Sequence, residues 1–181
     1  EELPDIVRRW RGSNQRIVDF WYSVERYALD TVRHGTTGYM PCGVAFDRDE
    51  DYLSIILPSG RRLYYYKPEI RVNDLGRDAI HFRGVNQKTK KWEVISTYGG
   101  KLTENIVQAV ARDLLANSLM NLYCEGFRID FHIHDEVILE VPEGSGRTLD
   151  EAVGIMCRLP GWAAGLPLNA DGFESRYYKK D

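Results

Sequence analysis

Few cysteines and no long apolar run occur in this 181-residue sequence, and each scarcity excludes a class of protein. The three cysteines are odd in number and form no C-x-x-C pair, which argues against a disulfide framework or a structural zinc site. We expect Cys42, Cys124 and Cys157 to be core residues. No apolar run approaches the ~20 residues of a membrane-spanning helix, and no charged-then-apolar signal pattern opens the chain. The sequence therefore predicts a soluble, cytoplasmic protein without a membrane partner.

Charge of neither sign dominates, and a net charge of −3 gives no hint of nucleic acid by itself. Residues 61–101, however, hold ten Lys and Arg against four Asp and Glu, whereas residues 135–181 hold nine Asp and Glu against five Lys and Arg. A basic middle suits a polyanion, and an acidic end suits a metal cation. Two solvated faces would give the same pattern, so charge leaves both interpretations open.

The length and the 43% hydrophobic content suit a single domain with a real core. Apolar residues at helical spacing in 1–11 and 17–32 predict two successive helices. The first helix is predicted to stop at Gly12, and Asn14 is the expected N-cap of the second. Gly35 is expected to end that second helix.

Alternating and β-branched runs then predict two β-hairpins. After a strand at 44–46, the first hairpin pairs residues 52–57 with 62–66 across a Pro-Ser-Gly turn. The second hairpin pairs 79–83 with 92–96 across a loop that contains three lysines, Lys88, Lys90 and Lys91. This cationic loop suits phosphate contacts or plain solubilisation.

The longest predicted helix covers residues 102–123, and its broad apolar face is expected to include Val107 and Ala111. Four polar side chains follow helical spacing and share one side of this helix: Lys101, Asn105, Gln108 and Arg112. Long amide and guanidinium groups aligned in this way reach the groove edges and phosphates of a duplex. A solvent-exposed helix face without any ligand would show the same spacing of polar side chains.

Residues 128–133 and 137–141 both predict strands, and the tip between them carries His134, Asp135 and Glu136. A hairpin tip holds a carboxylate on backbone that strand pairing has already fixed, which suits a divalent-cation site. Taken alone, the tripeptide equally suits a solvated turn, because Asp is an ordinary turn residue.

The remainder of the chain predicts one short helix and one extended segment. Thr148 and Glu151 have capping-box spacing and are expected to start a helix that runs to about Arg158. A Pro-Gly-Trp sequence ends that helix, and residues 166–178 predict a last strand or extended arm.

Four segments, in order, resemble the C-terminal part of family A DNA polymerases (the DNA polymerase I family), and in particular its bacteriophage and prophage branch. Residues 57–64 (LPSGRRLY) are similar to the hairpin that follows the fingers helices. Residues 97–115 (TYGGKLTENIVQAVARDLL) resemble the long helix before motif C, and 133–137 (IHDEV) resemble motif C itself. Residues 160–168 (PGWAAGLPL) are similar to the closing palm segment. The resemblance spans nearly the whole chain.

This resemblance implies roles for the hairpin tip and for the helix before it. Asp135 is implied to coordinate both Mg²⁺ ions of a two-metal nucleotidyl transfer, with Glu136 supporting the metal site. His134 is implied to help position the primer terminus. Gln108 matches the helix residue that contacts the duplex near the primer terminus, and Arg112 lies one turn further along.

Further DNA contacts are implied for Asn105, Lys101, Arg61 and Arg62. The family pattern places its Asn four residues before the Gln, whereas here the spacing is three. For either arginine a structural salt bridge is an equal alternative to a contact with the DNA backbone. The implied partners are primer-template DNA and deoxynucleoside triphosphates. The implied location is the bacterial cytoplasm, and the gene is implied to come from a phage or prophage.

Two parts of the family pattern are missing from these residues. Motif A, which carries the second metal-binding Asp, and the fingers helix that holds the incoming triphosphate would both lie upstream of Glu1. We therefore expect the chain to be a fragment that is inactive alone and that need not bind Mg²⁺, because one metal carboxylate is missing.

Two other functions fit parts of the sequence. His132, His134, Asp135 and Glu136 would make a transition-metal site of a small hydrolase or oxygenase if both histidines projected from one face of a strand. Few further imidazole ligands exist for such a site, because the chain has four histidines in all. Alternatively, the lysine-rich loop and the Gln108 and Arg112 side of the helix would serve a non-catalytic DNA-binding module.

The expected architecture is α+β. An antiparallel, palm-like sheet with the motif C hairpin and a final strand is expected to pack on the long helix, within residues 102–181. Two helices and two hairpins of the fingers region are expected within residues 1–101. Uncovered sheet edges and apolar helix faces would favour a homo-oligomer of the fragment.

Overall fold

The computed structural model describes residues 2–73 and 76–179, and the chain divides into two compact units, Glu1–Gln108 and Ala109–Asp181. Helices and antiparallel strands make up the units, which confirms the α+β class. The palm-like character of the predicted sheet stays a prediction, as does the assignment of the two regions to fingers and palm. Within the described residues no helix is long and apolar enough to span a membrane.

The first unit begins with two helices, as predicted. These are α1 (Glu2–Ser13) and α2 (Gln15–His34). Gly35 ends α2 with a φ of 67° and donates its N–H to the Thr31 carbonyl, which confirms the predicted glycine cap. Asn14 occupies the predicted N-cap position of α2, but its side chain does not cap the helix, because its amide donates to the Trp10 carbonyl of α1 at 2.8 Å.

A six-stranded antiparallel sheet follows, in the order β1-β2-β3-β4-β5-β6. Its strands are β1 (Gly38–Tyr39), β2 (Ala45–Arg48), β3 (Tyr52–Ile56), β4 (Arg62–Val72), β5 (Asp78–Val85) and β6 (Trp92–Thr97). Both predicted hairpins are confirmed as β3–β4 and β5–β6. The sequence did not predict that the long strand β4 pairs with β5, which joins the two hairpins into one sheet.

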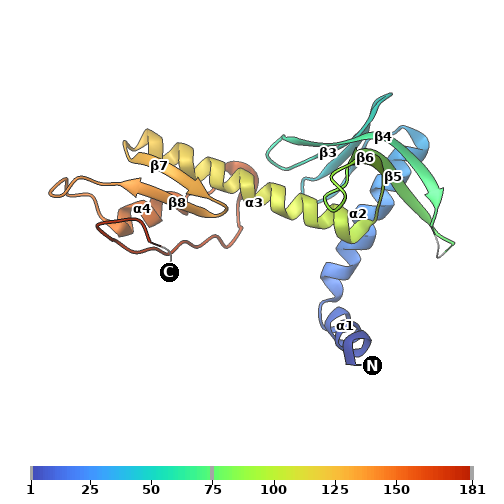
Figure 1. Cartoon of the computed structure of the whole chain (residues 1–181), viewed down its shortest axis with the longest axis horizontal. Helices are drawn as coiled ribbons and strands as arrows, with labels where there is room; N and C mark the ends of the chain where they lie inside the picture. The colour runs from blue at the N-terminus through green and yellow to red at the C-terminus, as the bar shows by residue number, and fades with distance from the viewer. Residues whose placement is uncertain (1, 74–75, 180–181) are drawn as a thin grey trace. The chain divides into compact units, whose positions relative to one another are not determined.

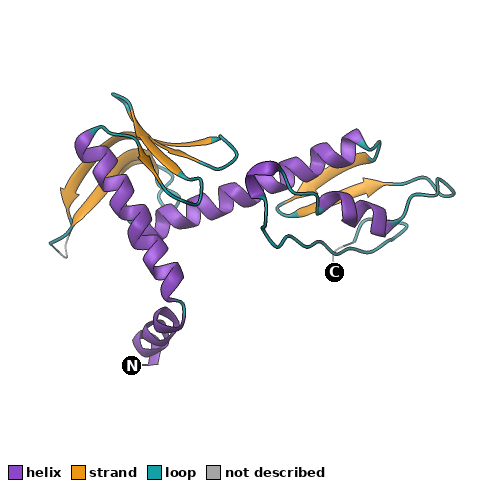
Figure 2. Cartoon of the chain, turned by 180° about the vertical axis from the view of Figure 1, so that it is seen from behind, coloured by secondary structure: helices purple, strands orange, loops and turns teal. Residues whose placement is uncertain are grey.

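One face of this sheet lies against α2, as the two opposite views in Figure 1 and Figure 2 show. Phe46, Ile55 and Leu63 are in register across β2, β3 and β4 and therefore share a face. The first two are fully buried, and the Phe46 ring stacks on Tyr27 of α2 at 6.1 Å between centroids. The core of the first unit therefore lies between α2 and this face.

Helix α3 (Gly99–Cys124) is the predicted long helix, three residues longer at its start. Gly99 fits tightly there, because a Cβ on it would come within 2.2 Å of the Trp21 carbonyl oxygen. Val107 and Ala111 were expected on the buried face but are exposed, Val107 by 58%. The buried side instead follows Leu102, Ile106 and Ala109 and then Leu114, Ser118 and Leu122. Apolar composition alone did not distinguish the two sides.

The second unit packs the rest of α3 with a β-hairpin and a short helix. Its elements are β7 (Arg128–Ile133), β8 (Glu136–Glu140), α4 (Leu149–Met156) and the 3-10 turn η1 (Gly161–Ala163). Leu122, Phe127, Ala152 and Ile155 form its buried cluster. The Glu151 N–H donates to the Thr148 hydroxyl at 3.2 Å, which confirms the predicted cap of α4.

The predicted final strand is wrong, because residues 166–179 form no strand in the described structure. Pro167 has no N–H to donate to a ladder, and the Asp171 carboxylate accepts the N–H of the next residue, Gly172, at 2.8 Å. The segment is instead attached by side chains: the Tyr178 ring meets Phe131 edge-on at 5.3 Å.

The expectation that all three cysteines are core residues is wrong. Cys42 and Cys124 are exposed, and Cys157 is half-buried. Cys42 lies in the turn between β1 and β2, and Cys124 is the last residue of α3, so neither position faces a core. All three are free thiols in this structure.

Candidate functional site

The β7–β8 hairpin closes with a two-residue turn made of His134 and Asp135. Ile133 pairs with Glu136, so these two residues alone connect the strands. His134 has a φ of 49°, in the left-handed region that favours glycine. The tripeptide predicted as a metal site therefore occupies the tip: two residues form the turn, and Glu136 begins β8.

A β-bulge in β7 lies just before the tip. Ile129 pairs with Leu139 and Phe131 with Ile138, which leaves Asp130 as an extra residue on β7. Strict alternation would place Phe131 on the same face as Ile129, but the bulge turns it to the opposite face, where it is 41% exposed. Sequence reasoning missed Asp130, because nothing in the alternating pattern of the strand signals an inserted residue.

The other face of the hairpin is anchored to the core of the second unit. Ile129, Val137 and Leu139 pack against the cluster formed by Leu122, Phe127, Ala152 and Ile155. The Arg147 guanidinium lies over the Phe127 ring at 4.4 Å and closes one side of this cluster. The hairpin is thus held by packing, so its exposed tip is carried on a supported scaffold.

The donor set at the tip fits a hard divalent cation only in part. Asp135 and Glu136 are exposed neighbouring carboxylates, and Mg²⁺ is commonly bound by one or two carboxylates together with water and substrate phosphates. Among the described residues no group of three or more His, Cys, Asp or Glu is arranged to hold a metal ion. A complete cation site would therefore need ligands from outside this group.

The geometry required by the alternative transition-metal site is absent. That hypothesis places His132 and His134 on one face of a strand, but β7 ends at Ile133 and His134 lies in the turn. His132 pairs with Val137 and is a strand residue. The premise of two histidines at strand spacing is therefore wrong.

The predicted DNA-contacting side chains of α3 have different surroundings. Lys101 forms an ion pair with Glu104 at 2.9 Å, and the Gln108 amide donates to the same carboxylate at 3.3 Å. Both are exposed and belong to the first unit, whereas exposed Arg112 belongs to the second. All three belong to α3, and their contact with DNA stays a prediction.

Asn105 differs because its side chain already forms a hydrogen bond within the first unit. Its amide N–H donates to the Tyr65 hydroxyl at 2.9 Å, and Tyr65 is only 5% exposed. Burial raises the pKa of the Tyr65 hydroxyl, whereas this hydrogen bond works in the opposite direction. A contact of Asn105 with DNA would thus compete with a bond that supports the sheet.

Arg62, predicted as a DNA-backbone contact, forms an ion pair with Asp47 at 3.2 Å. The hydrogen bond from Arg62 holds the pKa of the Asp47 carboxyl below its usual range. This is the structural salt bridge that was the alternative for this position. Arg61 is exposed just before β4, where the backbone N–H of Leu57 donates to its carbonyl.

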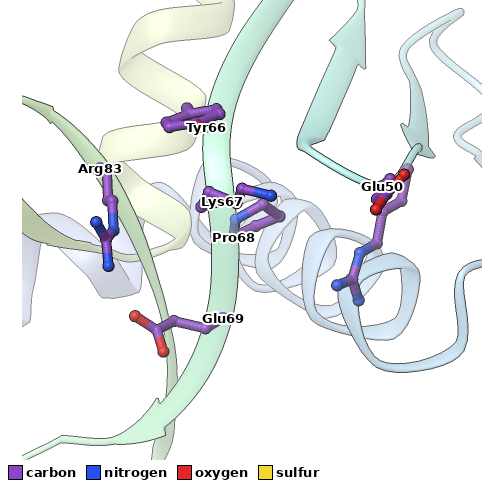
Figure 3. Close-up of a pocket in the computed structure, with 7 residues that line it drawn as sticks. Glu50, Tyr66, Lys67, Pro68, Glu69 and Arg83 are labelled. Carbon is purple, nitrogen blue, oxygen red and sulfur yellow. The ribbon is translucent and has the colours of Figure 1, made fainter.

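A second β-bulge, in β4, lies beside a hollow of about 390 Å³ (Figure 3). Lys67 and Pro68 fall between the paired residues Tyr66 and Glu69, and Lys67 has a φ of 48°. The hollow is lined by Arg48, Glu50, Tyr66, Lys67, Pro68, Glu69 and Arg83. Three cationic side chains from three strands therefore surround it, a feature that the sequence did not predict.

Comparison with known proteins relates the chain to a bacteriophage enzyme. The chain is 45% identical over 181 residues to the DNA polymerase of Bacillus phage SP02. The match covers 99% of this chain but 28% of that polymerase, so the chain spans under a third of its relative's length. No protein-family model and no solved structure matches the chain. The similarity confirms the resemblance to a bacteriophage DNA polymerase, while the assignment to family A stays a prediction.

Proposed function

We propose that this chain is part of a template-dependent DNA polymerase and that its β7–β8 hairpin supplies one side of the catalytic centre. The observation that carries the proposal is the 45% identity to a phage DNA polymerase along the whole chain. The proposed substrates of the complete protein are primer-template DNA and deoxynucleoside triphosphates. The reaction is transfer of a nucleotide to the primer 3′-hydroxyl, with release of pyrophosphate.

In this proposal Asp135 holds Mg²⁺ through its carboxylate and Glu136 supports the same position. When bound, the two ions would activate the primer 3′-hydroxyl and stabilise the charge of the leaving pyrophosphate. The remaining ligands, which include the second metal-binding Asp of motif A, come from outside residues 1–181. The positive φ of His134 belongs to the two-residue hairpin turn, which fixes the backbone on which Asp135 is carried.

The chain's contribution to DNA binding is assigned to α3. Gln108 and Arg112 are exposed long side chains one turn apart, and each presents donors suitable for groove edges or phosphates. Lys101 is next to Glu104, so its charge is partly neutralised. In the β3–β4 hairpin, Arg62 is engaged by Asp47, so a contact of Arg62 with DNA would have to replace that ion pair.

The test is a chimera in which residues 1–181 replace the matching part of the phage SP02 polymerase. With Asp135→Asn we expect primer extension to fall by about a thousand-fold or more, since a metal-binding carboxylate is lost while shape is conserved. Extension of a labelled primer with Mg²⁺ measures the change. Filter binding of the same primer-template should be nearly unchanged.

The matched control is Glu140→Gln, which removes a carboxylate from the other end of the same hairpin. Glu140 forms an exposed ion pair with Arg128 at 2.8 Å, so its loss should alter stability by no more than about 1 kcal/mol and leave extension near the unsubstituted level. Equal activities for the Asp135→Asn and Glu140→Gln variants of an active chimera would disprove the role of Asp135.

A further inference from the structure

Four aromatic rings form a continuous row on the face of the six-stranded sheet that points away from α2. We call Tyr64, Tyr52, Tyr66 and Trp92 the aromatic row. The Tyr52 centroid lies 5.7 Å from Tyr64 and 5.3 Å from Tyr66, and the Tyr66 centroid lies 6.3 Å from Trp92. The row thus crosses the sheet from β3 to β6.

The strand register assigns these rings to one face. Tyr52 pairs directly with Tyr66, and Tyr64 is two residues before it on β4. Tyr66 also pairs with Arg83, while Trp92 pairs with Val85, two residues further along β5. Neighbouring Tyr65 is on the opposite face, where it bonds to Asn105 of α3.

The two ends of the row are more exposed than sheet stability requires. Cross-strand aromatic pairs stabilise a sheet when they pack together, and half-buried Tyr52 and Tyr66 do so in the middle of the row. Tyr64 and Trp92, however, are 60% and 62% exposed. Large rings left in water at both ends of a row offer flat surfaces on which another planar group can stack.

The surroundings of the aromatic row are cationic. Arg83 lies beside Tyr66 (Figure 3), and among the described residues it has no ion-pair partner. The Lys67 ammonium lies 5.8 Å from the Tyr66 ring centre and also forms an ion pair with Asp51. The β5–β6 loop, which leads directly into Trp92, adds the exposed lysines at 88, 90 and 91. Residues 61–101 together hold ten Lys and Arg against four Asp and Glu.

We propose that the aromatic row and its basic surroundings bind a single-stranded stretch of nucleic acid. Bases have exposed π-faces only when they are unpaired, so a row of rings selects single strands over duplex, and cations beside it track the phosphates. The charge favours a polyanion over an apolar protein surface as the occupant. The inference rests on residues of the first unit and holds whether or not the hairpin tip of the second unit is catalytic.

Binding of a fluorescein-labelled oligo(dT) of about 12 nucleotides to the 181-residue chain tests this inference by anisotropy. We expect Tyr64→Ala and Trp92→Ala each to weaken binding roughly ten-fold, and Trp92→Phe to retain most of it because a ring is kept. Arg83→Gln should weaken binding and also reduce its dependence on salt concentration. A blunt duplex of the same length should be bound equally well by all three aromatic variants.

Tyr22→Ala is the matched control, because Tyr22 is a 58% exposed ring on α2 and not in the aromatic row. It should bind oligo(dT) like the unsubstituted chain. Failure of the unsubstituted chain to bind oligo(dT), or equal affinities for Trp92→Ala and Tyr22→Ala, would overturn the inference. Loss of self-association in Trp92→Ala with unchanged oligo(dT) binding would overturn it too and identify a protein surface. Neither result would bear on Asp135, which the chimera tests separately.

Discussion

His134 has a backbone conformation that glycine adopts more easily. The left-handed region disfavours an L-residue by about 1–2 kcal/mol, whereas a glycine loses roughly 0.5–1 kcal/mol more conformational entropy on folding. At a φ of 49° we therefore expect His134→Gly to raise the free energy of unfolding by about 0.5–1 kcal/mol. Urea denaturation followed by circular dichroism measures this change.

Lys90→Gly is the comparison for this prediction, because Lys90 has a φ of 57° in a loop to which no catalytic role is assigned. Both substitutions should stabilise, but only His134→Gly should slow primer extension in the polymerase chimera. A His134→Gly chain with unchanged or lower stability would mean that the histidine side chain contributes more than its backbone strain removes.

The tip was predictable because residues 128–133 alternate apolar and polar side chains and residues 137–141 are β-branched and apolar. These runs left His134, Asp135 and Glu136 between the strands, whereas in the structure Glu136 already begins β8. Single-residue exceptions were not predictable. Asn14 occupies the predicted N-cap position of α2, yet its side-chain amide bonds to the preceding helix and not to an N–H of α2, a choice between two local hydrogen bonds. Asp130 is an ordinary polar residue in an alternating strand, and only the pairing with β8 reveals it as inserted.

Helix α4 shows how much a short element depends on its cap. It has eight residues, too few to be stable without capping and packing. Thr148→Ala removes the acceptor for the Glu151 N–H and should lower the free energy of unfolding by about 1 kcal/mol. Amide hydrogen exchange by mass spectrometry should show faster exchange in residues 149–156.

Thr148→Ser keeps the hydroxyl acceptor and should restore most of the protection in α4. Equal exchange rates in the Ala and Ser variants would show that the cap is unimportant and that Ala152 and Ile155, which are buried in the core of the second unit, hold the helix without it.

Local signals identified the helices and hairpins, but pairings between distant segments were missed. The β3–β4 and β5–β6 hairpins are contiguous in sequence, whereas the β4–β5 ladder depends on the length of β4 beyond the bulge at Lys67 and Pro68. Likewise residues 166–178 are extended enough to suggest a strand, but no neighbouring ladder accepts them in the described structure.

At the scale of the whole molecule, the chain corresponds to 28% of a phage DNA polymerase. The proposed two-metal mechanism needs a second metal-binding Asp, and the described residues hold no cluster of three metal ligands. We therefore expect the 181-residue chain alone to show no primer extension with Mg²⁺ and all four deoxynucleoside triphosphates.

The active chimera is the positive control for that measurement, and heat-denatured chain gives the background. Template-dependent extension by the isolated chain, lost on Asp135→Asn, would show that two carboxylates at one hairpin suffice. Sedimentation velocity on the same sample tests the predicted homo-oligomer, which was inferred from uncovered edges and apolar helix faces.

The bulge in β7 also bears on how the hairpin tolerates insertions and deletions. A residue lost from a regular strand turns every side chain beyond it to the other face. Asp130 is already surplus to the pairing, so its deletion leaves Ile129 opposite Leu139 and Phe131 opposite Ile138, each on its present face. A variant that lacks Asp130 would therefore keep the strand pairing and the facing of side chains up to the turn that contains Asp135. The distance along the sequence from α3 to the hairpin tip can change by one residue without inverting the hairpin.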